Sequence, residues 1–319
     1  MKRAIFVVLA LAASGSAFAQ AAFPSRTVTM VVGFAPGGGT DITARIIVKK
    51  LSENIGQSIV VENRPGAGGN ISAAAVAKAA PDGYTIYLAN VGVLAVAPHI
   101  IANLPFHPQR DFAPITMTVV LDNVLVVHPS VPAKTLAEYL KEANSRPGGM
   151  PYGSSGIGGA GHLAGELLKL MAKANLVHVP YKGGGPAMSD ILGGQIPSMI
   201  ATTPTAAPHI KAGKIRAIGT TGTKRSAYLP DVPPIAEAYP GYEAVNWYAY
   251  VAPAKTPREI VERWNREIVK VLNTQETREL LLANGMEPTP STPEELAKTI
   301  ERELVIWGRV VKEAGIKAD

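Results

Sequence analysis

Short apolar segments alternate with segments of helical periodicity over the first three quarters of the chain. The predicted strands cover residues 27–34, 58–62, 85–89, 114–120, 123–127, 151–154, 176–180, 198–201 and 215–220. The predicted helices between them cover residues 41–55, 70–80, 135–144, 161–174 and 186–192. This alternation is typical of βαβ units and predicts an α/β protein with parallel sheets. Near-continuous apolar runs such as "NVLVVH" fit strands that are covered on both faces.

The last quarter of the chain is predicted to be helical, over residues 257–272, 274–284 and 292–314. Two of these helices begin with the same signal. A threonine, Thr256 or Thr292, stands at the N-cap position, a proline follows at the first helical position, and an acid lies in the first turn.

Two segments have the character of crossovers rather than ordinary loops. In one, near residues 121–124, two predicted strands follow each other without a helix, and the other is the Pro- and Tyr-rich stretch "YLPDVPPIAEAYPGYEAVNW". A chain that leaves one sheet, builds a second and returns places a cleft between two lobes. We therefore predict a monomer in which residues 20–123 and 247–319 form lobe 1 and residues 124–246 form lobe 2.

The N-terminal sequence "MKRAIFVVLALAASGSAFAQ" has the pattern of a cleavable signal peptide. Lys2 and Arg3 form a basic region, an apolar core follows, and small residues at Ala17 and Ala19 fit the cleavage rule. The apolar run is too short to span a membrane comfortably. We predict a signal peptide at 1–19, a mature chain that begins near Gln20, and a periplasmic location.

Charge and cysteine content narrow the functional classes. Removal of Lys2 and Arg3 lowers the formal charge from +6 to +4, and no basic cluster is interleaved with aromatic residues, so no nucleic-acid partner is predicted. The chain has no cysteine, which excludes disulfides, thiolate metal sites and a cysteine nucleophile.

Four glycine-rich loops stand where predicted strands end. They are "APGGGTD" at 35–41, "RPGAGGN" at 64–70, "GSSGIGGAGH" at 153–162 and "YKGGGPA" at 181–187. Successive glycines let backbone N–H groups converge on an anion, and the following helix contributes its positive end. One such loop is equally consistent with a tight turn. Four loops at corresponding strand ends face a common crevice, which favours an anion-binding cleft.

Nucleotide cofactors are not predicted. The spacing from Gly33 to Gly38 matches half of a phosphate-binding P-loop, but Gly39 stands where the lysine that reaches the phosphates is needed. The segment "GIGGAG" at 156–161 matches GxGxxG, but the next strand, "LVHVPY", ends without the acid that binds ribose.

Catalytic and metal chemistry have weak support in the sequence. Ser155 with His162 could form a nucleophile and base, but "GSSGI" lacks the second glycine of the GxSxG elbow. The six histidines, at 99, 107, 128, 162, 178 and 209, have no metal-ligand spacing, so no metal site is predicted. Asp41 is expected to cap its helix or complement the helix dipole rather than contact an anion.

Eight segments together resemble one protein family. They are "PSRTVTMVVGFAPGGGTDITAR", "VVENRPGAGG", "AAPDGYTIYL", "YGSSGIGGAGHLAGELLK", "HVPYKGGGPAMSDILGGQI", "PHIKAGKIRAIGTT", "KRSAYLPDVPPIAEAYPGYE" and "WYAYVAPAKTP". The chain resembles the Bug family, the extracytoplasmic solute-binding receptors of tripartite tricarboxylate transporters. The resemblance runs in order through nearly the whole mature chain.

The resemblance implies a type II periplasmic binding protein, in which two α/β lobes close on a small organic anion. It implies that two loops grip a ligand carboxylate, often through ordered waters, and that membrane permease subunits receive the ligand. It assigns ligand contacts to Ala35, Pro36, Gly37 and Gly38 of one loop, to Ser154, Ser155, Gly158 and Gly159 of the other, and to Asn90, Thr202 and Thr203. Tyr181 and Lys182 are candidates for the rim of the site, and Lys182 is equally consistent with a solvated surface lysine.

Two departures from the family pattern bear on the ligand. The segment "NVGVLAVAPHI" makes one pocket wall more apolar, and "MIATT" carries threonines where many relatives carry an acid. The missing acid favours a carboxylate without an amine, and di-, tri- and aromatic carboxylates all stay open. We predict a non-enzymatic transport receptor. The alternatives are a ligand sensor for a signalling partner and an exported hydrolase that uses Ser155 and His162.

Overall fold

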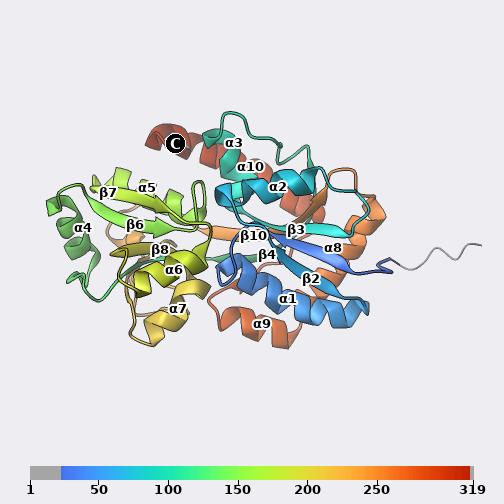
Figure 1. Ribbon diagram of the computed structural model, residues 1–319, viewed down its shortest axis with the longest axis horizontal. Coiled ribbons are helices and arrows are strands. Elements are labelled where there is room, and N and C mark those ends of the chain that lie inside the picture. Colours follow the sequence, from blue (N-terminus) through green and yellow to red (C-terminus); the bar gives the residue numbers. More distant parts are fainter. Residues whose placement is uncertain (1–22, 317–319) are drawn as a thin grey trace, which may run out of the picture.

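A computed structural model describes residues 23–316 and shows two β-sheets side by side, each flanked by helices (Figure 1). The α/β class predicted from the sequence is confirmed, whereas the predicted signal peptide at 1–19 lies outside the described residues. The first sheet has the strand order β11-β4-β10-β3-β1-β2, and the second has the order β7-β6-β8-β5-β9. None of the described helices is long and apolar enough to cross a membrane.

Nine of the described strands agree closely with the predicted ones, whereas β10 and β11 were not predicted. The first sheet contains β1 (Val28–Val32), β2 (Ile59–Asn63), β3 (Thr85–Asn90), β4 (Phe112–Leu121), β10 (Asn246–Pro253) and β11 (Glu287–Pro288). The second sheet contains β5 (Asn123–Val127), β6 (Met150–Ser154), β7 (Leu176–Pro180), β8 (Ser198–Thr202) and β9 (Arg216–Thr220).

Six of the described helices flank the first sheet, and four helices from the middle of the chain flank the second. With the first sheet lie α1 (Gly39–Ile55), α2 (Asn70–Ala77), α3 (Ala97–Ile100), α8 (Arg258–Leu272), α9 (Gln275–Leu282) and α10 (Pro293–Ala314). With the second lie α4 (Leu136–Ser145), α5 (Ala160–Ala172), α6 (Gly184–Leu192) and α7 (Thr203–Lys211). Short 3₁₀ segments occur at η1 (Ala67–Gly69) and η3 (Ile235–Glu237), and a π-helix at η2 (Gly92–Val96).

The predicted parallel sheets are found in part: β1 runs parallel to β2 and β3, and β6 runs parallel to β7 and β8. Strand β10 runs antiparallel to both β3 and β4, and β5 runs antiparallel to both β8 and β9. These two strands are the ones that enter directly from the other sheet. A parallel neighbour needs a long return connection such as a helix, and neither crossing has one in the usual place.

The chain crosses between the sheets at two points. Strand β4 ends at Leu121 and β5 begins at Asn123, so Asp122 alone joins them. The return runs from the end of β9 to the start of β10. We call the first sheet with its helices lobe 1 and the second sheet with its helices lobe 2. The residue limits predicted for the lobes stay a prediction.

Two helical segments were not predicted. The run "GVLAVAPHI" at 92–100 forms η2 and α3, because an apolar stretch of this length fits a buried helix as well as a strand. Residues 203–211 form α7 despite Pro204 and Pro208. Pro204 lies in the first turn, where its missing N–H costs nothing.

Each lobe has apolar packing that fixes its sheet. In lobe 1, α1 and α8 cover one face of the sheet around the fully buried Trp264, whose Nε1 donates to the carbonyl of Gly83 at 2.9 Å. The helix α10 packs against η2 and β4 on the other face and also touches α5 of lobe 2. Truncation of a buried side chain of this size costs about 3–5 kcal/mol, so this packing contributes strongly to the stability of lobe 1.

Candidate functional site

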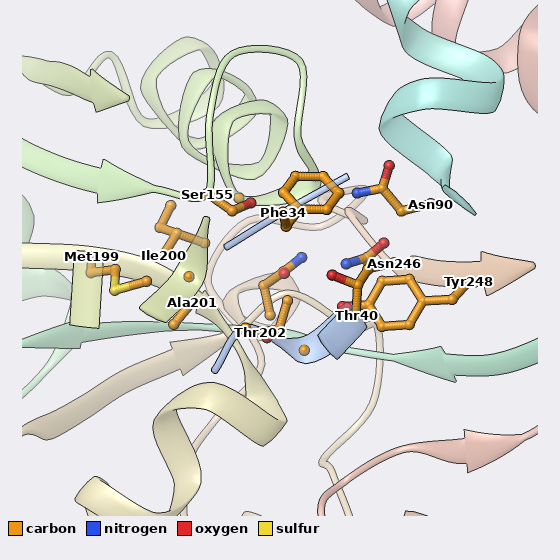
Figure 2. A pocket seen from close by; sticks show the side chains of 15 residues that line it. Phe34, Thr40, Asn90, Ser155, Met199, Ile200, Ala201, Thr202, Asn246 and Tyr248 are labelled. Atoms are coloured by element: carbon orange, nitrogen blue, oxygen red, sulfur yellow. The ribbon is translucent and has the colours of Figure 1, made fainter. Parts of the chain in front are cut away.

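A small cavity lies between the two sheets, next to both crossings (Figure 2). Its interior is about 20 Å³, slightly more than the roughly 10–15 Å³ that one water molecule needs by the same measure. The lobes are therefore closed on it. The cavity is lined by Phe34, Gly38, Gly39, Thr40, Asn90, Asn123, Ser155, Gly161, Gly184, Met199, Ile200, Ala201, Thr202, Asn246 and Tyr248.

Four helices begin at this cavity without a side-chain cap. The N-cap residues of α1, α5, α6 and α7 are Gly38, Gly159, Gly183 and Thr202, and none of them accepts a hydrogen bond from its helix through its side chain. The hydroxyl of Thr202 instead lies 2.8 Å from that of Thr205. Because the first N–H groups of a helix have no partner inside the helix, these four N-termini offer backbone donors and a positive potential to the cavity.

The first loop is held by a buried carboxylate. Oδ2 of Asp41 accepts from the backbone N–H of Gly37 at 3.0 Å, and Oδ1 accepts from Arg45 and Asn63, each at 3.0 Å. Burial alone would raise the pKa of Asp41, but these hydrogen bonds outweigh it and lower the pKa. Asp41 is not the N-cap residue of α1, but it lies in the first turn, which agrees with the second predicted role, that of complementing the helix dipole. It fixes Gly37 in the left-handed conformation (φ 80°) that turns the loop.

The loop of lobe 2 is held from below by two histidines. The hydroxyl of the fully buried Ser154 lies 2.7 Å from Nε2 of His178 and accepts from the N–H of Gly156. Nδ1 of His162 accepts from the N–H of Gly158 at 3.1 Å. The two imidazoles stack with their centroids 4.1 Å apart.

Burial and then the nearby charges of His162 and Lys169 lower the pKa of His178 to about 3, which keeps it neutral. In this loop the structure joins Ser154 to His178 by a hydrogen bond, whereas the sequence had suggested Ser155 with His162. Full burial keeps a substrate carbonyl away from Ser154, so this pair supports the loop.

The four glycine-rich loops meet across the cleft in two pairs. The first and fourth touch where the N–H of Ala35 donates to the carbonyl of Lys182 at 3.0 Å. A Cβ added to Gly185 of the fourth loop would lie 2.3 Å from the carbonyl oxygen of Pro36. The second and third touch where a Cβ on Gly68 would lie 2.2 Å from the carbonyl oxygen of Ile157. Glycines allow this backbone approach, which larger residues would prevent.

Of the ligand residues assigned by resemblance, four line the cavity together: Gly38, Asn90, Ser155 and Thr202. The others lie around it. Ala35, Pro36 and Gly37 face the fourth loop, while Ser154 and Gly158 are engaged with the histidines and Gly159 caps α5. Thr203 donates its hydroxyl to the backbone oxygen of Asp122.

The two rim candidates differ. The hydroxyl of Tyr181 donates to Asp190 at 2.7 Å, which directs it to its own lobe. Lys182 is exposed, and its carbonyl makes the contact with Ala35.

The sequence did not identify the floor of the cavity. Asn123, Asn246 and Tyr248 lie at the starts of the two crossing strands, β5 and β10. The first crossing was recognised from two strands that follow each other without a helix, and the second from its Pro- and Tyr-rich composition. The asparagines at the starts of β5 and β10 could have indicated the cavity floor, because a buried asparagine beside an otherwise apolar strand needs a hydrogen-bond partner.

The cavity lining contains no Asp, Glu, Lys, Arg or His. Any ion bound there meets neutral donors and acceptors: N–H groups, hydroxyls and amides. Among the described residues, no three His, Cys, Asp or Glu side chains come together in a way that could hold a metal ion. The arrangement suits an anion held by helix N-termini.

Comparison with known proteins agrees with this geometry. BugT of Bordetella pertussis is 35% identical over 315 residues, which cover 98% of this chain and 97% of BugT. The structure of R. palustris Rpa4515 with adipate has a TM-score of 0.89 at 38% identity, covering 92% of this chain and 99% of that one. MatC (Rpa3494) from Rhodopseudomonas palustris, with bound malate, has a TM-score of 0.87 at 32% identity and covers 91% of this chain and 100% of that one.

The family model that describes the tripartite tricarboxylate transporter family receptor, TctC, matches residues 43–316. The match spans most of the chain and includes all but the first of the four glycine-rich loops. Together with the BugT match, it confirms the resemblance seen in the sequence. The chain belongs to the TctC family of tripartite tricarboxylate transporter receptors, the family of the Bug proteins.

Proposed function

We propose that this protein captures a small organic carboxylate in the periplasm and delivers it to the permease of a tripartite tricarboxylate transporter. The observation that carries the proposal is the convergence of four helix N-termini without side-chain caps on one cavity that has no charged lining. A carboxylate is the common metabolite group whose charge and acceptor oxygens match such a set of N–H donors.

The carboxylate is held between the lobes. Gly38 and Gly39 at the start of α1 face it from lobe 1, and Ser155 with Gly161 at the start of α5 face it from lobe 2. The ligand contacts both lobes only when they are closed, so it shifts the population of the protein towards the closed state. The interior is small, and the lobes must separate slightly to admit a carboxylate of several carbons.

The relatives support this ligand class. Rpa4515 is described with adipate and MatC with bound malate, and both of these compounds are dicarboxylates. The helix N-termini bind an ionised carboxylate directly or through water, and nothing in the lining supplies a reaction. We therefore propose a receptor that holds its ligand unchanged. Neighbouring genes for a permease would support delivery, whereas a neighbouring kinase would favour the sensor alternative.

A thermal-shift screen on the mature protein, starting at Gln20, tests the proposal. The panel contains di-, tri- and aromatic carboxylates, with sulfate and chloride as controls for non-specific anion effects. A ligand at about 100 times its Kd stabilises the folded protein by about 2.7 kcal/mol. We expect a clear rise in Tm with at least one carboxylate and none with the inorganic ions. No stabilisation by any carboxylate would contradict the proposal.

A further inference from the structure

Two buried amide oxygens in the cavity lack hydrogen-bond partners. Asn123 is 0% exposed and Asn246 is 2% exposed, and both line the cavity. Within the part of the chain that the structure describes, neither Oδ1 atom accepts a hydrogen bond. An unpaired buried oxygen of this kind costs about 1–3 kcal/mol, so the folded protein gains when a donor reaches it.

The hydrogen bonds of the two amides fix which atom is left over. Nδ2 of Asn123 donates to the carbonyl oxygen of Ala244 at 3.3 Å, and a carbonyl oxygen can only accept. Burial raises the pKa of Tyr248, and hydrogen bonds from Thr202 and Asn246 to its hydroxyl partly oppose that rise. Asn246 lies beside this hydroxyl, and of its side-chain polar atoms only Oδ1 is buried without a partner among the described residues. The oxygens of Asn123 and Asn246 are thus the amide atoms left for the cavity, and Figure 2 shows Asn246 among the residues that line it.

A third amide in the same cavity serves as an internal comparison. Asn90 also lines the cavity, but its Oδ1 accepts from the backbone N–H of Val93 at 3.1 Å. The unpaired oxygens are thus confined to the starts of β5 and β10, on the side of the cavity where the chain crosses between lobes.

The two unpaired oxygens restrict the kind of ligand group that can bind beside them. A second ionised carboxylate has only acceptors, so it would leave both oxygens unpaired and add repulsion. An ammonium group would donate, but no acidic side chain lines the cavity to balance its charge. An uncharged donor, such as a hydroxyl or a carboxamide N–H, satisfies the oxygens without burying an unbalanced charge.

We propose that the ligand carries, besides the carboxylate bound by the helix N-termini, an uncharged hydrogen-bond donor that meets Oδ1 of Asn123 and of Asn246. This inference rests on the proposed function and narrows its ligand class. It places hydroxycarboxylates and carboxamide-bearing acids ahead of simple dicarboxylates of the same length.

Isothermal titration calorimetry with matched ligand pairs tests the inference. The hydroxyl pairs are propionate with lactate and succinate with malate, and the amide pair is succinate with succinamate. We expect the member with the added donor to bind at least about 10-fold more tightly in at least one pair, since one well-placed hydrogen bond in a buried site is worth this much. The pairs also distinguish a hydroxyl from an amide donor.

Three variants assign any such preference to the amide oxygens. Asn246→Leu removes one acceptor and should reduce the preference to below about 3-fold. Asn246→Asp supplies a negative charge and should make alanine bind better than lactate. Asn90→Leu removes an amide whose oxygen is already paired, so it should weaken both members of a pair alike and keep their ratio. Thermal unfolding of each variant establishes that it folds, and Asn246→Ser replaces Asn246→Leu if that variant does not.

The outcomes separate this inference from the proposed function. If propionate and succinate bind as tightly as their partners, the inference is wrong while the carboxylate receptor stands. If the preference exists but survives in both Asn246 variants, the amide oxygens are not its cause and the inference is likewise wrong. If no carboxylate binds at all, both proposals fail together.

Discussion

Helices that begin at the cleft differ from helices that begin on the outer surface. Side-chain hydroxyls cap α4, α9 and α10 through Thr135, Thr274 and Thr292, and none of these helices lines the cavity. At the cleft, glycine holds the N-cap position of three helices, and Thr202 at the fourth turns its hydroxyl to Thr205. The outer helices use a side-chain cap for their first N–H groups, whereas the cleft helices have no such cap, and within the described residues only the first N–H of α7 is paired, with the backbone oxygen of Asp122.

The difference shows how one structural feature serves either stability or binding. A threonine or serine cap stabilises a helix by about 1 kcal/mol, and glycine caps sacrifice little of this because water can reach the N–H groups. Absence of a side-chain cap does not by itself mark a ligand site, since α8 begins after Pro257 without one. What distinguishes the cleft is that four such N-termini share a cavity.

The largest expected effect comes from the contact between the first and fourth loops. In Gly185→Ala the new methyl group would lie 2.3 Å from the carbonyl oxygen of Pro36 in the other lobe, so the closed state cannot form as observed. We expect ligand affinity to fall at least about 100-fold, or about 2.7 kcal/mol. Calorimetry measures the affinity, and small-angle scattering should show a larger radius of gyration with ligand than in the unmodified protein.

The matched control for this variant lies at the other end of the same helix. A Cβ on Gly193 would meet other atoms at 3.4 Å or more, which is ordinary contact. Gly193→Ala should therefore leave the affinity within about 2-fold. The thermal stability of unliganded Gly185→Ala should not fall, because alanine is favoured over glycine in a helix. Equal affinity in the two variants would show that closure does not depend on the glycine contact.

A carboxylate beside α7 gives the next largest effect. The backbone oxygen of Asp122 accepts from the N–H and the hydroxyl of Thr203 at the start of α7. Burial raises the pKa of the Asp122 carboxyl group to about 6. Between pH 4 and pH 6 the unfolded chain releases a proton that the folded chain retains, so the free energy of unfolding falls as pH rises through this window. Above it, Asp122→Asn should be more stable than the unmodified protein by about 2 kcal/mol.

Urea unfolding at pH 4, 5, 6 and 7 measures this dependence. The free energy of unfolding of Asp122→Asn, minus that of the unmodified protein, should rise with pH and level off above pH 6. Glu138 supports the N-terminus of α4 with its carboxylate. If the Asp122 carboxylate did the same for α7, its pKa would be lowered, and the difference between the two free energies of unfolding would have the opposite sign.

The contrast between the two groups of helices also explains what the sequence could predict. The helical pattern located α1, and the cap signals located α8 and α10, all within two residues, because local pattern determines such elements. The glycine loops and their common crevice were likewise readable from local motifs. The pairing of these loops across the cleft was not, since it depends on how two lobes meet.

The cavity floor was missed for the same reason. Asn123 and Asn246 are more than a hundred positions apart in the sequence and come together only through the sheet topology. The helix α7 was missed because two prolines argue against a helix locally, and its start at the cleft is fixed by Thr203 bonding to Asp122. Long-range contacts thus supplied the part of the site that local pattern could not.

An added cap at the cleft should have a smaller effect than blocked closure. The backbone of Gly38 is extended (φ −83°, ψ 167°), so a serine fits there and its hydroxyl can accept from α1. In Gly38→Ser we expect the unliganded protein to be as stable or slightly more stable. Affinity should fall about 10-fold, because the hydroxyl competes with the ligand for the N–H groups and the Cβ lies 3.3 Å from the backbone nitrogen of Gly184. Unchanged affinity would argue against ligand binding at the start of α1.

The smallest effect is the converse change on an outer helix. Thr292 caps α10 in a capping box, in which its hydroxyl accepts from the N–H of Glu295 and the Glu295 carboxylate accepts from the N–H of Thr292. Thr292→Ala removes the first of these bonds and should lower the free energy of unfolding by about 1 kcal/mol. Ligand affinity should stay unchanged, since α10 does not line the cavity. Denaturant unfolding and calorimetry on the same sample separate the two quantities. A loss of affinity without a loss of stability would overturn the division between helices that serve the fold and helices that serve the ligand.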